Sequence, residues 1–413
     1  MNPKINSTKP FYNTTIPSDW EILEFGEFAE TSKGKYVPDE NENLRCLELE
    51  HFEQGTGHIL GWMNSSEQKS TKNVFKKGQV LFGKLRPYLK KYWLAEFDGV
   101  CSSEVWVLST KNKKCINEFL FRLVQSNQFI QVSNVSSGSK MPRADWNYIS
   151  TFPFLLPPLP EQRAIANLLS AWDTAINKSN QLIAQKQVHK KWLMQNLLTG
   201  RLRLRSASGE RFGGEWKKVK LGDIFERVIR KNTEGCTNVV TISAQRGFVR
   251  QTDFFNKKIA STTLDNYFLV KNGEFCYNKS YSNGYPKGAT KRLNNYEQAV
   301  VTTLYICFGI KENHNSNGDF FEQYFEANYL DRGLTKIAHE GGRAHGLLNV
   351  TPSDFFALKI TIPSIEEQTA IAKVLQTADE EIKVLTQKRD YLKEQKKGMM
   401  QQLLTGKKRL KIV

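Results

Sequence analysis

Residues 157–204 read PPLPEQRAIANLLSAWDTAINKSNQLIAQKQVHKKWLMQNLLTGRLRL, and residues 363–410 read PSIEEQTAIAKVLQTADEEIKVLTQKRDYLKEQKKGMMQQLLTGKKRL. The second stretch repeats the first without a gap at a shift of 206 residues, from 157 to 363. The Glu-Gln pair at 161–162 thereby aligns with the pair at 367–368, and Leu-Leu-Thr-Gly at 197–200 aligns with 403–406. A repeat period of about half the chain predicts two similar halves, each a globular region followed by one long helix.

Apolar residues in both stretches recur at alternating steps of four and three, which is the spacing of a coiled-coil seam. The seam consists of Ile165, Leu169, Trp172, Ile176, Ile183, Leu193 and Leu197 in the first helix, and of Ile371, Leu375, Ile382, Leu385, Leu392, Met399 and Leu403 in the second. The first helix leads from the first domain to the second, and the second helix leaves the second domain. If their seams pair, the second helix is expected to run back toward the first domain, so the two helices are expected to be antiparallel. Polar seam residues are expected to fix the register, with Ser179, Lys186 and Lys190 facing Leu385, Arg389 and Leu392.

The ends of both helices carry recognisable signals. Pro160 suits a first helical turn, and Ser364 with Glu367 has the spacing of a capping box. Gly200 and Gly406 suit left-handed C-caps. At about 1.5 Å per residue, a helix of roughly 38 residues would be about 57 Å long.

The regions before the helices also repeat, since SDWEILEFGEFAE at 18–30 resembles EWKKVKLGDIFER at 215–227, with Trp20 aligned on Trp216. Short β-rich runs broken by Gly, Asn and Lys follow in each half, which predicts an α+β fold with an internal pseudo-two-fold repeat. The predicted parts are a polar tail (1–17), a first globular domain (18–156), a helical region (157–204), a linker (205–214), a second globular domain (215–362), and a second helical region with a basic tail (363–413).

The charge balance indicates a polyanionic partner. There are 59 Lys and Arg against 42 Asp and Glu, a net charge of +17, which favours a nucleic acid backbone. No Cys-x-x-Cys pair or metal-ligand spacing of His occurs, so no metal site is predicted, and the six cysteines are interpreted as reduced thiols of a cytoplasmic protein. No apolar run is long enough to span a membrane.

Double-stranded DNA is the predicted partner, because two similar domains on a helical rod could bind two half-sites about one helical turn apart. Cationic and amide side chains near glycines or strand ends are the candidate contacts, since they can reach base edges or neutralise phosphates. These candidates are Lys84, Arg86, Tyr88, Ser139, Lys140, Arg143, Gln245, Arg246, Arg250, Asn278, Lys279, Lys287, Arg343 and His345.

Catalytic motifs are not supported. GQVLFGKL at 78–85 has the spacing of a phosphate-binding loop, but Leu85 stands where a metal-binding Ser or Thr belongs. Its counterpart at 273–280, GEFCYNKS, has Asn278 in place of the second glycine. Scattered acids at Asp39 and Glu67 lack the further ligands that a nuclease metal site needs. The chain is therefore predicted to bind without catalysis, and no catalytic residue is assigned.

Over nearly its whole length the sequence resembles the specificity subunit of type I restriction–modification enzymes. The likeness is carried by LPPLPEQRAIANLLSAWD at 156–173 and IPSIEEQTAIAKVLQTAD at 362–379, by the LLTGR and LLTGK helix ends, and by Trp20 and Trp216. It implies that residues 18–156 and 215–362 are target recognition domains, which read the 5′ and 3′ halves of an asymmetric bipartite DNA site. The helical regions would set the spacing and dock partner subunits.

The resemblance also implies that the chain itself is non-catalytic and holds no cofactor. Two modification subunits would bring S-adenosylmethionine and methylate adenine, and restriction subunits would use ATP and Mg to translocate and cleave DNA. Ile365 and Glu366 replace Leu159 and Pro160 in the second copy, so the two helix starts differ in detail. Alternatives are a specificity subunit of a standalone methyltransferase or another defence system, and a coiled-coil protein scaffold.

Overall fold

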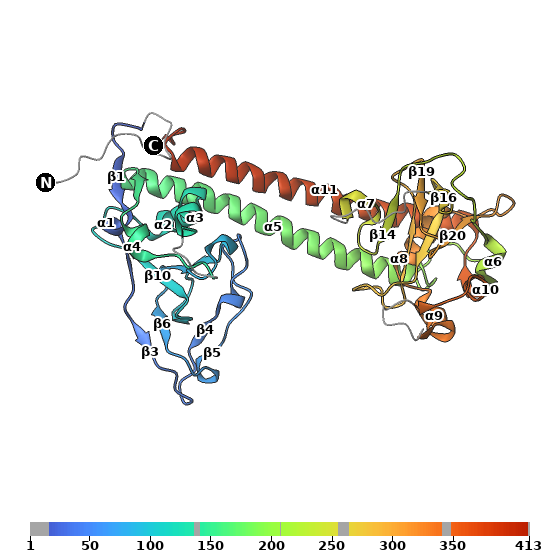
Figure 1. Ribbon diagram of the computed structural model, residues 1–413, viewed down its shortest axis with the longest axis horizontal. Helices are drawn as coiled ribbons and strands as arrows, with labels where there is room; N and C mark the ends of the chain where they lie inside the picture. The colour runs from blue at the N-terminus through green and yellow to red at the C-terminus, as the bar shows by residue number, and fades with distance from the viewer. Residues whose placement is uncertain (1–15, 136–140, 207, 255–263, 341–347, 412–413) are drawn as a thin grey trace. The chain divides into compact units, whose positions relative to one another are not determined.

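The structure is a computed structural model that describes residues 16–135, 141–206, 208–254, 264–340 and 348–411. The chain forms two compact units: unit 1 is Met1–Asn180 with Thr386–Val413, and unit 2 is Gln181–Leu385. The two long helices α5 (Leu159–Leu197) and α11 (Ile365–Leu404) each contribute one portion to either unit (Figure 1). The two helices that the repeated stretches predict are thereby confirmed.

Unit 1 combines short helices with three small sheets. Its short helices are α1 (Phe25–Phe28), α2 (Asn117–Gln125), α3 (Asn127–Ser133) and α4 (Trp146–Ser150), with 3-10 helices η1 (Leu49–His51), η2 (Ser65–Glu67) and η3 (Pro87–Leu89). Its strands are β1 (Glu21–Glu24), β2 (Ala29–Thr31), β3 (Lys35–Tyr36), β4 (Arg45–Leu47), β5 (Met63–Asn64), β6 (Lys72–Phe75), β7 (Val80–Gly83), β8 (Tyr92–Leu94), β9 (Gly99–Cys101), β10 (Val105–Thr110) and β11 (Pro153–Leu156). In Figure 1, α1 to α4 lie beside the first turns of α5, and β3 to β6 lie farther from that helix.

Unit 2 has the same kinds of element in nearly the same order. Its short helices are α6 (Leu221–Ile224), α7 (Gln251–Phe254), α8 (Gly318–Glu326), α9 (Asp331–Ile337) and α10 (Pro352–Phe356). Its strands are β12 (Lys217–Lys220), β13 (Phe225–Arg227), β14 (Val240–Ser243), β15 (Gly247–Arg250), β16 (Phe268–Lys271), β17 (Phe275–Asn278), β18 (Ala289–Arg292), β19 (Gln298–Val301), β20 (Ile306–Ile310), β21 (His339–Glu340), β22 (Leu348–Asn349) and β23 (Lys359–Ile362).

The strand order of the two units shows that the internal repeat is structural. A four-stranded sheet has the order β2-β10-β7-β8 in unit 1 and β13-β20-β17-β18 in unit 2, and a strand pair, β1-β11 or β12-β23, opens and closes each domain. The α+β fold with an internal repeat is therefore confirmed.

The second sheet differs more between the two units than the four-stranded sheet does, yet its strands have the same order in both. Unit 1 has five strands in the order β3-β6-β9-β4-β5, with β4 and β9 parallel. Unit 2 retains the pairs β16-β19 and β14-β15, which are joined by a parallel bridge between Val239 and Val300. In unit 2 the link between these two strand pairs is therefore a single bridge, and the strand order is the same.

Each unit has two hydrophobic cores, one of which includes the end of the other half's long helix. In unit 1, Leu403 and Leu404 from α11 are buried with Phe25, Phe129 and Ile165. The equivalent core of unit 2 buries Leu197 and Leu198 beside Phe225, Phe308 and Ile371. Complete burial of one leucine side chain stabilises a fold by about 1.5–3 kcal/mol. The repeated Leu-Leu-Thr-Gly segment is therefore a core element of the domain that it reaches.

An ion pair between an arginine and a buried glutamate joins the helix ends in both units. In unit 1, Arg409 donates to Glu161 (Nε–Oε1 2.7 Å), and the indole of Trp20 donates to the same carboxylate at 3.0 Å. In unit 2, Arg203 donates to Glu367 (Nε–Oε1 2.6 Å), and Trp216 Nε1 donates at 3.3 Å. We call each set a Trp–Glu–Arg latch. It joins the residues that follow one long helix to the start of the other, so the two helices run antiparallel within each unit.

A second polar contact between the helices also repeats. Asp173 in α5 pairs with Lys396 in α11 within unit 1 (2.5 Å), and Asp379 in α11 pairs with Lys190 in α5 within unit 2 (2.6 Å). Lys186 pairs with Glu381. Lys186 and Lys190 were expected to face Leu385, Arg389 and Leu392, and this is wrong, because their ammonium groups pair with carboxylates. Ser179 donates to the Ala175 carbonyl of its own helix.

The helix-end predictions are confirmed with one exception. Gly200 and Gly406 both have φ +71°, the left-handed conformation of a C-cap, and Pro160 lies in the first turn of α5. The Ser364 hydroxyl accepts a hydrogen bond from the Glu367 amide, as a cap requires. The reciprocal half of the capping box is absent, because the Glu367 carboxylate pairs with Arg203 instead.

All of the predicted seam residues are buried or half-buried. A continuous coiled coil stays a prediction.

Within the described residues, no helix is both long enough and apolar enough to cross a membrane.

Candidate nucleic-acid interface

The predicted contact residues Lys84 and Lys279 occupy the same position in the two units. Lys84 follows β7 and Lys279 follows β17, which are equivalent strands of the four-stranded sheets. A later segment returns to this point in both units, since the amide of Ala144 donates to the Lys84 carbonyl and the amide of Leu348 donates to the Lys279 carbonyl. The fold thus brings the segments before α4 and α10 beside the ends of β7 and β17.

In unit 1 the structure brings Lys84, Arg86 and Arg143 together. Leu85 forms a β-bridge with Arg143, and the Arg86 amide donates to the Pro142 carbonyl at 2.8 Å. Arg143 is half exposed, and its Nε donates to Glu104 Oε2 at 3.1 Å. Arg86 is exposed, and Lys84 is half-buried. These three residues therefore form one cationic edge, in which Glu104 partly compensates Arg143.

Tyr88 extends this edge, because it lies in η3 with its side chain 50% exposed. The other two candidates of this region, Ser139 and Lys140, lie outside the described residues.

In unit 2 the candidates gather around a hairpin turn and the loop at 279–288. Gln245 and Arg246 form the turn between β14 and β15, and both are exposed. Gln245 Nε2 donates to the Asn283 carbonyl at 2.9 Å, which joins the turn to the loop. Asn278 Nδ2 donates to the Ile242 carbonyl, and its Oδ1 accepts from the Ser280 amide. Both ends of the Asn278 amide are therefore hydrogen-bonded inside the unit, whereas Arg246 is exposed.

Lys279 lies in surroundings that disfavour its charged form. Partial burial lowers its pKa, and the nearby positive charge of Arg227 lowers it further. In the described part of the chain, no carboxylate pairs with it. A half-buried ammonium that lacks a counter-ion in this region suits an anionic ligand.

The remaining candidates of unit 2 are dispersed. Lys287 lies in the same loop, where its carbonyl accepts from the Tyr277 hydroxyl at 2.7 Å. Arg250 lies at the opposite end of the hairpin from the turn, with its guanidinium 5.7 Å from the ring centre of Tyr296. Arg343 and His345 lie outside the described residues. Among the described residues, no group of His, Cys, Asp and Glu could hold a metal ion.

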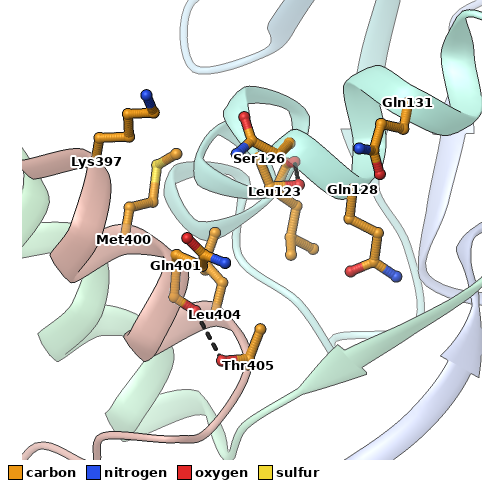
Figure 2. A pocket seen from close by; sticks show the side chains of 10 residues that line it. Leu123, Ser126, Gln128, Gln131, Lys397, Met400, Gln401, Leu404 and Thr405 are labelled. Carbon is orange, nitrogen blue, oxygen red and sulfur yellow. Dashed lines mark hydrogen bonds between the residues drawn. The ribbon is translucent and has the colours of Figure 1, made fainter. Parts of the chain in front are cut away.

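A groove lies at equivalent places in both units, and the sequence did not indicate it. In unit 1 it has a volume of about 260 Å³ and lies between the α2–α3 corner and the last turns of α11 (Figure 2). Leu123 and Gln128 line one side, and Met400 and Leu404 line the other. The groove of unit 2 measures about 480 Å³. It is lined by Leu198 and Thr199 and by the aromatic residues Tyr324, Tyr329 and Trp216.

The latch residues were also missed as a set. In the sequence, Glu161 and Glu367 belong to a repeated motif, Arg203 lies at the end of the first helical region, and Arg409 lies in the region with the basic tail. The available signal was their common shift of 206 residues, from 203 to 409, which matches the shift of the two glutamates. This common shift suggests that the glutamate and the arginine play equivalent parts in the two halves.

A model of the type I restriction modification DNA specificity domain matches residues 17–185 and 213–394, which is most of both halves. A curated relative, the EcoDI specificity subunit of a type I restriction enzyme from Escherichia coli, is 33% identical over 190 residues, or 44% of this chain and 42% of the relative. The MjaVIII specificity subunit from Methanocaldococcus jannaschii is 24% identical over 99% of this chain and 97% of its own length.

Solved structures with the same fold cover nearly the whole chain. The HsdS subunit from Thermoanaerobacter tengcongensis has a TM-score of 0.51 and 19% identity, covering 95% of this chain and 98% of that one. A chain solved in a study of complex assembly and conformational transition of a type I restriction–modification system has a TM-score of 0.58 and 19% identity, with 95% and 99% coverage. The S subunit from M. genitalium has a TM-score of 0.55 and 13% identity, with 95% and 97% coverage. These likenesses concern the fold.

Proposed function

The chain belongs to the family of specificity subunits of type I restriction–modification enzymes, and from this premise we propose that it reads an asymmetric, interrupted DNA site, with one half-site bound by each unit. The observation that carries the proposal is the equivalence of the strand ends at Lys84 and Lys279. Their neighbours differ: Arg86 and Arg143 in unit 1, and Gln245 and Arg246 in unit 2. Because the side chains at these equivalent strand ends differ between the two units, each unit would read a different base sequence.

The charge of these surfaces supports a duplex as the ligand. Exposed guanidinium groups can donate two hydrogen bonds to a guanine edge, and the amide of Gln can pair with adenine. Lys279 and Lys84 would neutralise phosphates, which positions the protein without specifying sequence. The net charge of +17 favours this role.

Partner subunits would bind the helices and the grooves. Val188 and Trp192 are 70% and 50% exposed on one face of α5, and the ring of His189 stacks on Trp192. They lie about 200° around the helix from Lys190, which contacts α11, so they point away from that helix. Exposed aromatic and aliphatic residues on one helical face are typical of a protein interface.

The chemistry is assigned to the partners. Two modification subunits would supply S-adenosylmethionine and methylate adenine, and restriction subunits would use ATP and Mg to cleave DNA. The specificity subunit would contribute recognition and assembly. The equivalent grooves in the two units suit two copies of one partner.

The test is a salt titration of DNA binding by the chain assembled with its modification subunits. The logarithm of the affinity should fall linearly with the logarithm of the salt concentration, and a competitor lacking the site should bind at least about a thousandfold more weakly. Equal affinity for all duplexes, or binding that does not respond to salt, would exclude sequence recognition. In that case the chain would be an assembly scaffold.

A further inference from the structure

The loop after β7 holds its backbone in an unfavourable conformation at two charged residues. Arg86 and Lys90 have φ values of +53° and +52°, the left-handed region that residues other than glycine and asparagine rarely adopt. They bracket the three-residue helix η3, which begins with the buried Pro87 and has Tyr88 at its centre. Glycine would be less strained at both positions, so their cationic side chains are retained at a conformational cost.

Hydrogen bonds to other segments hold this loop rigidly. The Arg86 amide donates to the Pro142 carbonyl at 2.8 Å, and the Gly55 amide donates to the Lys90 carbonyl at 2.9 Å. Within the loop, the amides of Leu89 and Lys90 donate to the carbonyls of Arg86 and Pro87. The result is a fixed projection that presents an aromatic ring, 50% exposed, between two exposed cations.

Unit 2 has an exposed tyrosine at the corresponding place. Tyr281 follows Lys279 by two residues after the equivalent strand β17, and its side chain is 67% exposed. The following turn is closed by hydrogen bonds between Ser282 and Tyr285. An exposed ring beside a cation therefore occurs at the same strand end in both units, although the loop sequences differ.

We propose that Tyr88 stacks on a nucleobase of the half-site that unit 1 reads, and that Tyr281 does so in the half-site of unit 2. This inference rests on the proposed function and adds a mode of contact to it. Stacking on a base of a duplex requires that base to separate from its neighbour in the stack, as happens where an inserted side chain kinks the DNA. The ring would then cover the exposed base face, and the cations would neutralise the adjacent phosphates. A prepositioned ring loses little conformational entropy on binding.

The test uses the chain assembled with its modification subunits, on duplexes in which 5-iodouracil replaces each thymine of the site in turn. Light should crosslink one position in one half-site to Tyr88 and one position in the other to Tyr281. Tyr88→Ala should lower affinity for the specific site by roughly 5- to 100-fold and leave non-specific binding unchanged. Tyr88→Phe should bind within about twofold of the wild type, because it keeps the ring.

The matched control is Tyr148→Ala. Tyr148 is also exposed, but it lies in the helix α4, which packs against α1, and not in the loop after β7. The Tyr148→Ala variant should bind the specific site with the affinity of the wild type. If the wild type binds its site specifically and Tyr88→Ala binds it with the same affinity, the stacking role is overturned, while the proposed function stands. A Tyr88→Phe variant as weak as Tyr88→Ala would also overturn it, since the hydroxyl would then make the contact. If the wild type showed no specific binding, the proposed function itself would fail.

Discussion

Arg203 and Glu367 form a two-pronged ion pair, with Nε–Oε1 at 2.6 Å and Nη2–Oε2 at 2.8 Å. Arg409 and Glu161 repeat this pair at a shift of 206 residues, from 203 to 409. Both glutamates are almost completely buried. The arginine in each case comes from the segment after the other half's helix, so each globular domain is completed by residues from the other half of the sequence.

Removing the arginine of a latch should destabilise its unit strongly. Arg203→Ala leaves the charge of Glu367 buried without its main partner, and we expect unit 2 to lose about 3–5 kcal/mol of unfolding free energy. Arg203→Lys should lose less, because a lysine keeps the charge but not the second hydrogen bond. Denaturant-dependent hydrogen exchange at backbone amides of unit 2 measures this. Arg201→Ala, an exposed arginine two residues earlier, is the control, and an equal loss there would contradict the role of the latch.

The two inter-helix aspartates should differ in their importance. Asp173 pairs with both Arg122 and Lys396, whereas Asp379 pairs with Lys190 and accepts from the neutral amide of Gln323. Asp173→Asn leaves two largely buried cations without a counter-ion, and Asp379→Asn leaves one. The melting temperature of Asp173→Asn should therefore be the lower of the two. The reverse order would show that these contacts do not govern stability.

The latch and the aspartates also show what the sequence could predict. The repeat, the two helices, their C-caps and the α+β fold followed from local patterns, since helix period and glycine placement act over a few residues. The partners of Glu367 and Lys190 did not follow, because the facing residues depend on the register between segments more than 150 residues apart. Similarly, the cations at Lys84 and Arg143 could be suggested from composition, but their contact depends on the tertiary fold.

Trp192 should be needed for assembly and not for folding. Its half-exposed ring stacks on His189 of the same helix, so Trp192→Ala should leave the melting temperature nearly unchanged. Association with the modification subunit should weaken by about 2 kcal/mol or more, roughly 30-fold, as for an aromatic interface residue. Sedimentation or titration calorimetry with the purified modification subunit measures it. Lys191→Ala is the control, and wild-type affinity for Trp192→Ala would place the docking surface elsewhere.

Lys279 should make DNA binding sensitive to alkaline pH. Burial and Arg227 lower its pKa, so it loses its proton at a lower pH than an ordinary lysine. Phosphate contact requires the protonated form, and affinity should therefore fall as the pH rises through this lowered pKa. Lys279→Arg should keep its affinity over the same range, because guanidinium stays charged. At neutral pH, Lys279→Ala should reduce the slope of the logarithm of affinity against the logarithm of salt concentration by about 1. An identical pH profile for wild type and Lys279→Arg, together with an unchanged salt dependence for Lys279→Ala, would show that Lys279 makes no phosphate contact.

Base-resolution mapping of DNA methylation by the complete complex tests the central claim most directly. The wild type should methylate one asymmetric site with two specified parts separated by an unspecified spacer. Arg86→Ala with Arg143→Ala should relax bases in one part only, and Gln245→Ala with Arg246→Ala should relax bases in the other part only. Methylation of an uninterrupted site, or variants of one unit that alter both parts, would contradict the division of recognition between the two units.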